Sequence, residues 1–351
     1  MRALEYLNKP EYWFRPAQAF RRLVRQRGRH EVVEAVRLPW GMRLRIRPEE
    51  TIGRAIWQTG LYDLAVSETI ARLLQPGDRA IDAGANLGYM TGIMAWRVGE
   101  RGQVWSFEPH PELVAELRAN VGLWGQAGAA VRVLGKALGE TEGEATLVQT
   151  AEFARNRGTS SLLGTTAGSG TAATAGSLPP HEPAVGRAGC PQPAADHPDA
   201  PEARRRSEDT APYQRLVQEA GASGQETRFS VELTRLDSIC SGEASFGLLK
   251  IDVEGGELAV LKGAAGLLRA RRIRQVVFEE HDRYPTPVTN LLEANGYTVF
   301  RLVKGWFGPG LIPAGEPALG PAWVPPSFLA TLDPAGARQA LGGRGWRVLG
   351  G

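Results

Sequence analysis

The chain has 351 residues, with 41 Lys and Arg residues against 38 Asp and Glu residues, which gives a formal net charge of +3. Hydrophobic residues make up 42% of it, so disorder throughout the chain is excluded and one large domain or two small ones are expected. The small positive charge predicts no nucleic-acid partner, because that would require a concentrated basic face.

The sequence shows no sign of a membrane or disulfide-bonded protein. No stretch approaches about 18 consecutive apolar residues, so no membrane span is expected. The N-terminal sequence MRALEYLNKPEYWFRP carries charges throughout, unlike a secretory signal. The two cysteines, Cys190 and Cys240, lie in no CxxC motif or Cys/His cluster, which argues against zinc and disulfides. We therefore expect a cytoplasmic protein.

The first 50 residues predict an N-terminal extension. Residues 1–30 have the pattern of a helix with aromatic side chains, and two alternating apolar runs around Pro39, Trp40 and Gly41 predict a β-hairpin. A mostly helical stretch is then expected over 52–78, ended by Pro76, Gly77 and Asp78.

From Arg79 onward, strand-like and helix-like segments alternate. Strands are expected in RAIDAG, GQVWSFEP, AVRVLGKAL, FGLLKIDVEG, IRQVVFEEH and YTVFRLV, with amphipathic helical segments between most of them. This alternation predicts an α/β domain with an open, doubly wound, mostly parallel sheet and helices on both faces.

One segment interrupts this pattern. Residues 164–212 are rich in Ala, Gly, Thr, Ser and Pro, and they contain almost no large apolar side chain that could offset the entropy of ordering. They are predicted to be a disordered low-complexity insertion, after which TRFSVELTRLDSI resumes β structure. The predicted main domain thus spans 51–163 and 213–303, and residues 304–351 form a Pro/Gly-rich C-terminal tail.

The stretch AIDAGANLGY, residues 80–89, ends a predicted strand with a glycine turn. A dinucleotide-binding turn needs G-x-G-x-x-G, but Asn86 occupies the position of the second glycine. Asp82 precedes the turn, where a cationic or amine-bearing ligand would be favoured. These features favour S-adenosylmethionine over NAD, although a plain strand-to-helix turn that needs Gly for a positive φ is an alternative.

A second acid follows at the end of the next strand. Glu108 lies 24 residues after Gly84, and an acid at this strand end accepts hydrogen bonds from ribose hydroxyls. This feature predicts a nucleoside ligand without choosing between the two cofactors.

AIDAGANLGY, VWSFEPHPELVAELRANV and LLKIDVEGGELAVLKGA together resemble the FkbM family of S-adenosylmethionine-dependent methyltransferases. GLYD (60–63), GTSSL (158–162), LTRLDSI and FEEH are similar to further family motifs; Asp63 in place of Glu, and the insertion, are departures. The resemblance implies a Rossmann-like class I methyltransferase fold with an antiparallel edge strand. It also implies S-adenosylmethionine as cofactor and methyl transfer to an oxygen of a sugar, glycan or secondary metabolite.

Three residues are candidates for catalysis. Asp252 falls at the end of the strand in LLKIDVEGGE, while Glu279 and His281 fall at the end of the following strand, and ligands bind outside such strand ends. A hydroxyl nucleophile benefits from a base, and His281, Asp252 and Glu279 are all chemically suitable. These groups could also bind a metal, but no ligand spacing is specific enough, so no metal is predicted.

The cofactor contacts are predicted from the fold and the resemblance. Asp82, Gly84, Asn86 and Gly88 are expected around the methionine part of the donor, and Glu108 at the ribose. The resemblance adds Tyr62, Asp63 and Ser160. Two alternatives stay open: an NAD-dependent oxidoreductase or epimerase, disfavoured by Asn86 and the lack of a Tyr-x-x-x-Lys pair, and a non-catalytic nucleoside-binding module.

Overall fold

The computed structural model describes residues 33–125, 129–149, 153, 157, 160–165, 227–242, 245–316 and 327–349. The predicted helix over 1–30 and nearly all of the 164–212 insertion lie outside the described residues. Within these ranges, no helix combines the length and the apolar character needed to cross a membrane.

The centre of the fold is an eight-stranded sheet with the order β13-β12-β14-β11-β10-β3-β4-β5. β3, β4, β5, β10 and β11 run parallel, β14 lies antiparallel between β11 and β12, and β13 is an antiparallel edge strand. The strands are β3 (Arg79–Ala83), β4 (Gln103–Phe107), β5 (Ala130–Leu134), β10 (Leu248–Ile251), β11 (Gln275–Glu279), β12 (Thr298–Lys304), β13 (Pro309–Pro313) and β14 (Ser327–Thr331). The predicted doubly wound, mostly parallel sheet is confirmed.

Alternate residues of the central strands supply two separate cores. In β3, Ala80 packs into one hydrophobic cluster and Ile81 into the other, and Val104 and Trp105 of β4 divide in the same way. Successive side chains of a strand point to opposite faces, so a strand buried on both faces reads as a continuous apolar run. This explains why these strands could be predicted from short apolar runs without polar alternation.

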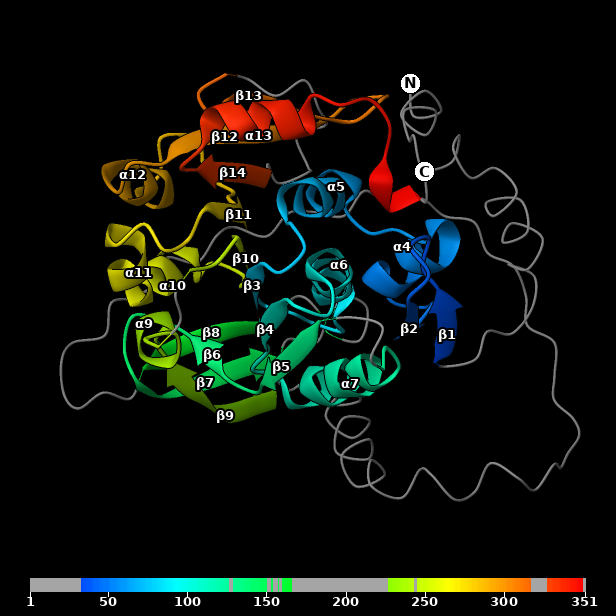
Figure 1. Ribbon diagram of the computed structural model, residues 1–351. Coiled ribbons are helices and arrows are strands. Elements are labelled where there is room, and N and C mark those ends of the chain that lie inside the picture. The colour runs from blue at the N-terminus through cyan, green and yellow to red at the C-terminus, as the bar shows by residue number, and fades with distance from the viewer. Residues whose placement is uncertain are drawn as a thin grey trace, which may run out of the picture.

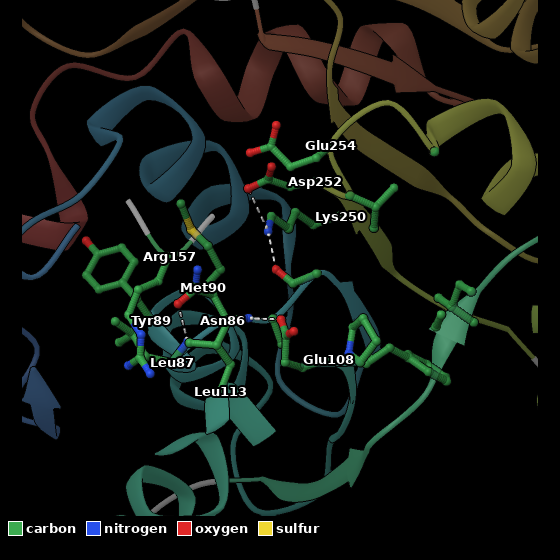
Figure 2. Close-up of a pocket in the computed structure, with 18 of the residues that line it drawn as sticks. Asn86, Leu87, Tyr89, Met90, Glu108, Leu113, Arg157, Lys250, Asp252 and Glu254 are labelled. Atoms are coloured by element: carbon green, nitrogen blue, oxygen red, sulfur yellow. Dashed lines mark hydrogen bonds and ion pairs between the residues drawn. The ribbon is translucent and has the colours of Figure 1, made fainter. Parts of the chain in front are cut away.

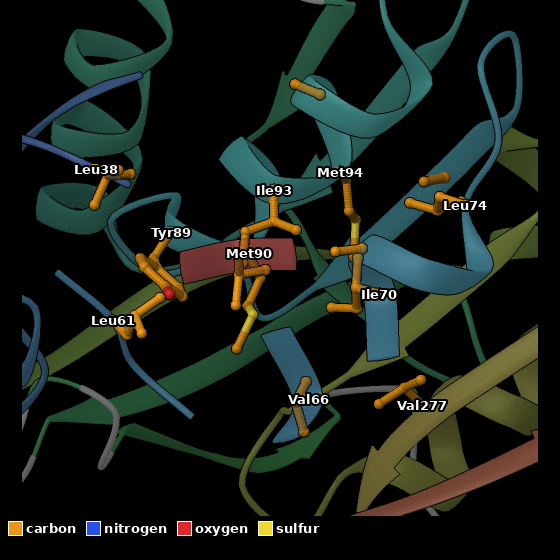
Figure 3. Close-up of a cluster of buried hydrophobic side chains, with 14 of the residues drawn as sticks. Leu38, Leu61, Val66, Ile70, Leu74, Tyr89, Met90, Ile93, Met94 and Val277 are labelled. Atoms are coloured by element: carbon orange, nitrogen blue, oxygen red, sulfur yellow. The ribbon is translucent and has the colours of Figure 1, made fainter. Parts of the chain in front are cut away.

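Helices cover both faces of the sheet (Figure 1). On one face, α5 (Leu64–Leu73) and α6 (Tyr89–Val98) pack together in the cluster shown in Figure 3, and α13 (Pro334–Leu341) packs on α5. The other core involves α10 (Glu257–Gly263), α11 (Ala265–Arg269) and α12 (Pro287–Ala294). α7 (Pro111–Gly122) packs against β5 and against β2 (Arg43–Ile46), which forms the predicted hairpin with β1 (Glu34–Arg37).

A second sheet, with the order β6-β9-β7-β8, was not predicted. The expected strand AVRVLGKAL is divided between β5 of the main sheet and β6 (Ala137–Leu138), which pairs with β9 (Thr227–Thr234). β7 (Gly143–Gln149) pairs with β9 and with β8 (Ser160–Thr165). The predicted β structure of LTRLDSI ends at Thr234, because Leu236–Ile239 form the short helix α9.

The helical stretch predicted over 52–78 is two helices, α4 (Thr51–Thr59) and α5. Gly60 ends α4 with φ 82°, a conformation that favours glycine. Asp63 is the N-cap of α5, and its side chain accepts a 3.1 Å hydrogen bond from the backbone N–H of Val66. The intervening turn thereby holds Tyr62 and Asp63 at the start of α5.

Residues 304–351, predicted as a tail, contribute β13, β14 and α13 to the main domain. A buried ion pair in α5, between Glu68 and Arg72 (Nε to Oε1, 2.6 Å), binds the end of this region. Glu68 accepts hydrogen bonds from the backbone N–H groups of Arg347 and Val348, while Arg72 donates to the carbonyl of Gly343. The last described residues are therefore attached to α5 by charged, buried hydrogen bonds.

Candidate functional site

A cavity of about 170 Å³ lies at the carboxyl ends of β3, β4, β5, β10 and β11. Figure 2 shows its lining, with Asn86 and Glu108 on one side and Lys250, Asp252 and Glu254 on the other. A small side cavity shares five of its lining residues, which are Tyr62, Met90, Lys250, Asp252 and Glu279. Crevices outside the carboxyl ends of strands are where open α/β sheets bind ligands.

The loop after β3 uses all of its backbone donors internally. The N–H groups of Gly84 and Ala85 donate to the carbonyl of Phe107, and that of Gly88 donates to Ala85. The N–H of Asn86 donates to Glu108, and that of Leu87 donates to the side chain of Asn86, at 2.8 and 2.7 Å. No N–H group from Gly84 to Gly88 is thus left for a phosphate, which such turns usually bind through these groups.

Gly84 allows this loop to lie directly against the end of β10. Its φ is 78°, and a Cβ atom at this position would lie 1.8 Å from the carbonyl oxygen of Asp252. Gly88 is the N-cap of α6, with φ 97°, and a Cβ there would lie 2.6 Å from Cδ1 of Leu117. Gly84 therefore shapes the cavity directly, whereas Gly88 allows the close approach of α7 and is not among the lining residues.

Glu108 lines the cavity with a largely buried carboxylate. Its two oxygens accept one hydrogen bond each, from the backbone N–H groups of His110 (2.9 Å) and Asn86 (2.8 Å). Burial is the main reason why its pKa is raised to about 7, against the lowering effect of these two hydrogen bonds. Each carboxylate oxygen has a further lone pair that can accept from a ligand hydroxyl.

Asp82 lies behind the cavity rather than in its lining. Its side chain is fully buried, and it accepts a 2.6 Å hydrogen bond from the hydroxyl of Thr91. Burial raises the pKa of Asp82, while the nearby ammonium of Lys250 opposes this. Within the described part of the chain, the partners of Asp82 are therefore protein side chains, those of Thr91 and Lys250. Its predicted contact with a cofactor stays a prediction.

Four acidic or phenolic side chains meet at the other end of the cavity. Asp252, Glu279 and Tyr62 line both cavities, and Asp63 lines the side cavity. Burial, followed by the charges of Asp252 and Asp63, raises the pKa of Glu279 to about 8. The pKa of Asp63 is raised as well, mainly by burial. Glu279 is therefore a carboxyl group whose pKa is near neutral pH.

His281 and Ser160 are not placed in the cavity. His281 is exposed and lies outside the lining of both cavities. Ser160 begins β8, where it pairs with Gln149, and its side chain is outside the described part of the structure. The catalytic and binding roles predicted for these two residues stay predictions.

Several lining residues were not predicted from the sequence, namely Ile52, Leu87, Met90, Leu113, Lys136, Ala137, Leu138, Leu147, Arg157 and Leu162. Arg157 is the most strongly held of them, because it forms ion pairs with Glu50, Glu112 and Glu116. Most of these residues belong to the second sheet or to loops beside it, and of those only Leu162 lies in a family-like motif, GTSSL. Among the described residues, no three His, Cys, Asp or Glu side chains form a group suited to a metal ion.

Comparison with known proteins places the chain among methyltransferases. The model of the Methyltransferase FkbM domain matches residues 82–299, more than half of the chain. No curated protein matches.

The chain is also similar to solved structures at low identity. A SAM-dependent O-methyltransferase from Thermotoga maritima is 14% identical, with 77% of this chain and 65% of that chain covered and a TM-score of 0.35. A methyltransferase FkbM from Methylobacillus flagellatus KT is 12% identical, with 78% and 52% covered and a TM-score of 0.33. Fibrillarin from Aeropyrum pernix with natively bound S-adenosyl-L-methionine is 13% identical, with 86% and 95% covered and a TM-score of 0.32. The chain spans less than two thirds of the first two structures.

Proposed function

This chain belongs to the FkbM family of S-adenosylmethionine-dependent methyltransferases, as its sequence motifs predicted, and we propose that it methylates a hydroxyl of a sugar, glycan or secondary metabolite. One observation carries the proposal. A single cavity is lined by Glu108 and the Gly84–Leu87 loop at one side and by the carboxylates of Asp252 and Glu279 at the other. Residues that can hold the methyl donor and a carboxylate that can accept a proton thereby line the same cavity.

The lining residues fit the chemistry of S-adenosylmethionine. Glu108 has free lone pairs for the ribose hydroxyls of the donor. Ala137, Leu138 and Leu147 provide an apolar surface for its adenine ring. The loop from Gly84 to Gly88 would follow the methionine part, and it has no free N–H group for a pyrophosphate. These features support the methyl donor over NAD.

The carboxylates at the far end supply the base. When bound, S-adenosylmethionine supplies an electrophilic methyl group on a positively charged sulfur. An acceptor hydroxyl becomes a stronger nucleophile as its proton passes to a neighbouring base. Glu279 accepts that proton in our proposal, because a carboxyl with a pKa near 8 is a much better base than an ordinary one. Asp252 lies beside it in the same cavity and increases this basicity through its charge.

Calorimetry with two ligands tests the donor assignment. We expect S-adenosylhomocysteine to bind and NADH to give no measurable heat, because no N–H group of the loop after β3 is free for a phosphate. Tight binding of NADH without binding of S-adenosylhomocysteine would instead support the oxidoreductase alternative. Donor binding without methyl transfer to any acceptor would support the non-catalytic module.

The acceptor class is tested with labelled S-adenosylmethionine and a panel of sugars, glycans and hydroxylated secondary metabolites. We expect mass spectrometry to locate the label on oxygen. Label found only on nitrogen or carbon would contradict the proposed acceptor class while leaving the family assignment intact.

Glu279→Gln tests the proposed base. In the unaltered protein, kcat/KM should rise with pH and level off above about 8, because Glu279 must lose its proton before it can accept one from the acceptor. The amide cannot act as a base, so we expect a loss of about 100-fold or more in kcat and no rise through this pH range. His281→Gln is the matched control. If it removes the pH dependence while Glu279→Gln does not, the base is His281.

A further inference from the structure

We propose that Lys250 is a positioning residue for the donor site: its ammonium holds the loop after β3 and the side chain of Asp252 in one arrangement. This inference rests on the proposed function, because it concerns how the same cavity is assembled. It concerns a residue that lines the cavity but takes no part in the proposed proton transfer.

The ammonium of Lys250 has three oxygen partners, one in β3, one in the loop after β3 and one directly after β10. It donates to the carbonyl of Gly84 at 3.1 Å, and it lies 3.2 Å from Oδ2 of Asp252 and 3.5 Å from Oδ1 of Asp82. The hydrogen bond to Gly84 is not part of the backbone pairing between β3 and β10, and it connects Lys250 to the loop after β3. Figure 2 shows Lys250 between this loop and Asp252.

The backbone around this lysine explains why one side chain reaches both sides. Lys250 and Asp82 are register partners in the parallel pair β10 and β3. The last backbone link between the two segments is the N–H of Asp252, which donates to the carbonyl of Ala83 at 3.1 Å. Gly84 follows Ala83 directly, and the Lys250–Gly84 hydrogen bond continues the connection by one residue into the loop.

The bond to Gly84 also complements the rest of the loop. Every N–H group from Gly84 to Gly88 has a partner, and Lys250 adds a charged donor for the carbonyl of Gly84. Hydrogen bonds with a charged partner are stronger than neutral ones. Burial by itself lowers the pKa of Lys250, but the carboxylates of Asp252 and Asp82 outweigh this and raise it, so the lysine stays charged.

The alternative to a positioning role is that Lys250 only neutralises the charge of Asp82. That carboxylate is fully buried, and within the described structure Lys250 is the cation that lies beside it. The two roles can be separated, because Asp82→Asn removes the buried charge without restoring a donor to Gly84. An amide at position 82 can still accept the hydrogen bond from Thr91.

The test compares Lys250→Met, Asp82→Asn and the double variant with the unaltered protein, using calorimetry with S-adenosylhomocysteine and thermal unfolding. Lys262→Met is the control, because Lys262 is a half-exposed lysine on α10 whose partner Glu140 lies outside the cavity lining. We expect Lys250→Met to weaken binding by about tenfold or more, the effect of losing one charged hydrogen bond, and to lower the unfolding temperature. The double variant should regain much of the unfolding temperature but not the affinity.

Three results would overturn or redirect this inference. Unchanged affinity in Lys250→Met shows that the lysine does not position the loop. Affinity that returns together with stability in the double variant shows that Lys250 only neutralises Asp82. If Lys250→Met does not fold, the double variant decides between the same two outcomes. Absence of binding to the unaltered protein contradicts the proposed function itself, which distinguishes that failure from failure of the positioning role.

Discussion

Replacing Gly84 by alanine should abolish measurable binding of S-adenosylhomocysteine and destabilise the protein. The new Cβ atom would lie 1.8 Å from the carbonyl oxygen of Asp252 and 2.9 Å from its carbonyl carbon. Neither atom can move away as a flexible side chain would, because both belong to the backbone at the end of β10. The loop after β3 must therefore shift, and this would displace Asn86, which belongs to the loop and lines the cavity.

Gly77→Ala is the matched control, because it separates this contact from backbone strain. Gly77 has φ 90°, close to the 78° of Gly84, but a Cβ atom there would meet nothing within 4 Å. Both variants carry the cost of a left-handed conformation, about 1–2 kcal/mol. The control should lose about that much in free energy of unfolding and bind S-adenosylhomocysteine normally. Normal binding by Gly84→Ala would show that the loop adapts and is not shaped by this contact.

The loop after β3 was predictable because its requirements are local. The turn has two glycines with positive φ and an asparagine at φ 50°. Glycine adopts positive φ readily, so these residue types indicate a turn. The position of Glu108 was predictable too, since an acid that follows an apolar strand lies at the carboxyl edge of a parallel sheet. Family motifs then supplied the cofactor, which these local features alone only favoured.

The orientation of the strand-end acids was harder to predict. Asp82 and Glu108 both end apolar strands in the sequence, yet Asp82 is directed to Lys250 and Thr91 inside the sheet while Glu108 lines the cavity. Asp82 lies inside β3, whereas Glu108 is the first residue after β4. The residue that lies opposite Asp82 is set by the register of β3 with β10. That register joins residues that are far apart in the chain.

The parts that were missed depend on pairing between distant segments. β14 is only five residues long, and it is buried because β11 and β12 flank it on both sides. The residues of β6 belong to the predicted strand AVRVLGKAL, but their pairing with β9 was missed, because β9 lies beyond the insertion. The five residues of β14 are too few for a periodic pattern to identify them. Residues that line the cavity from these regions, such as Leu138, could not be recognised for the same reason.

Arg72→Met should lower the free energy of unfolding by about 3–5 kcal/mol, the usual effect of removing one partner from a buried ion pair. The side chains of Arg72 and Glu68 are 3% and 0% exposed, so solvent cannot replace the lost partner. The carbonyl of Gly343 would also lose its charged donor. Urea denaturation measures the change, and Arg54→Met is the control, because its 3.8 Å pair with Glu49 is exposed and should contribute about 0–1 kcal/mol.

The double variant Glu68→Gln with Arg72→Met tests the cause of this loss. If the uncompensated charge of Glu68 dominates, the amide should recover part of the stability, because it carries no charge and its single oxygen can still accept from one of the two backbone N–H groups, of Arg347 or of Val348. If attachment of the C-terminal region dominates, the double variant should remain as unstable as Arg72→Met. An Arg72→Met protein as stable as the Arg54→Met control would contradict both explanations. Asp63, the N-cap of α5, lines the side cavity with Asp252 and Glu279. Calorimetry of the same variants with S-adenosylhomocysteine then tests whether α13 and the 343–349 segment support the candidate site from the opposite end of α5.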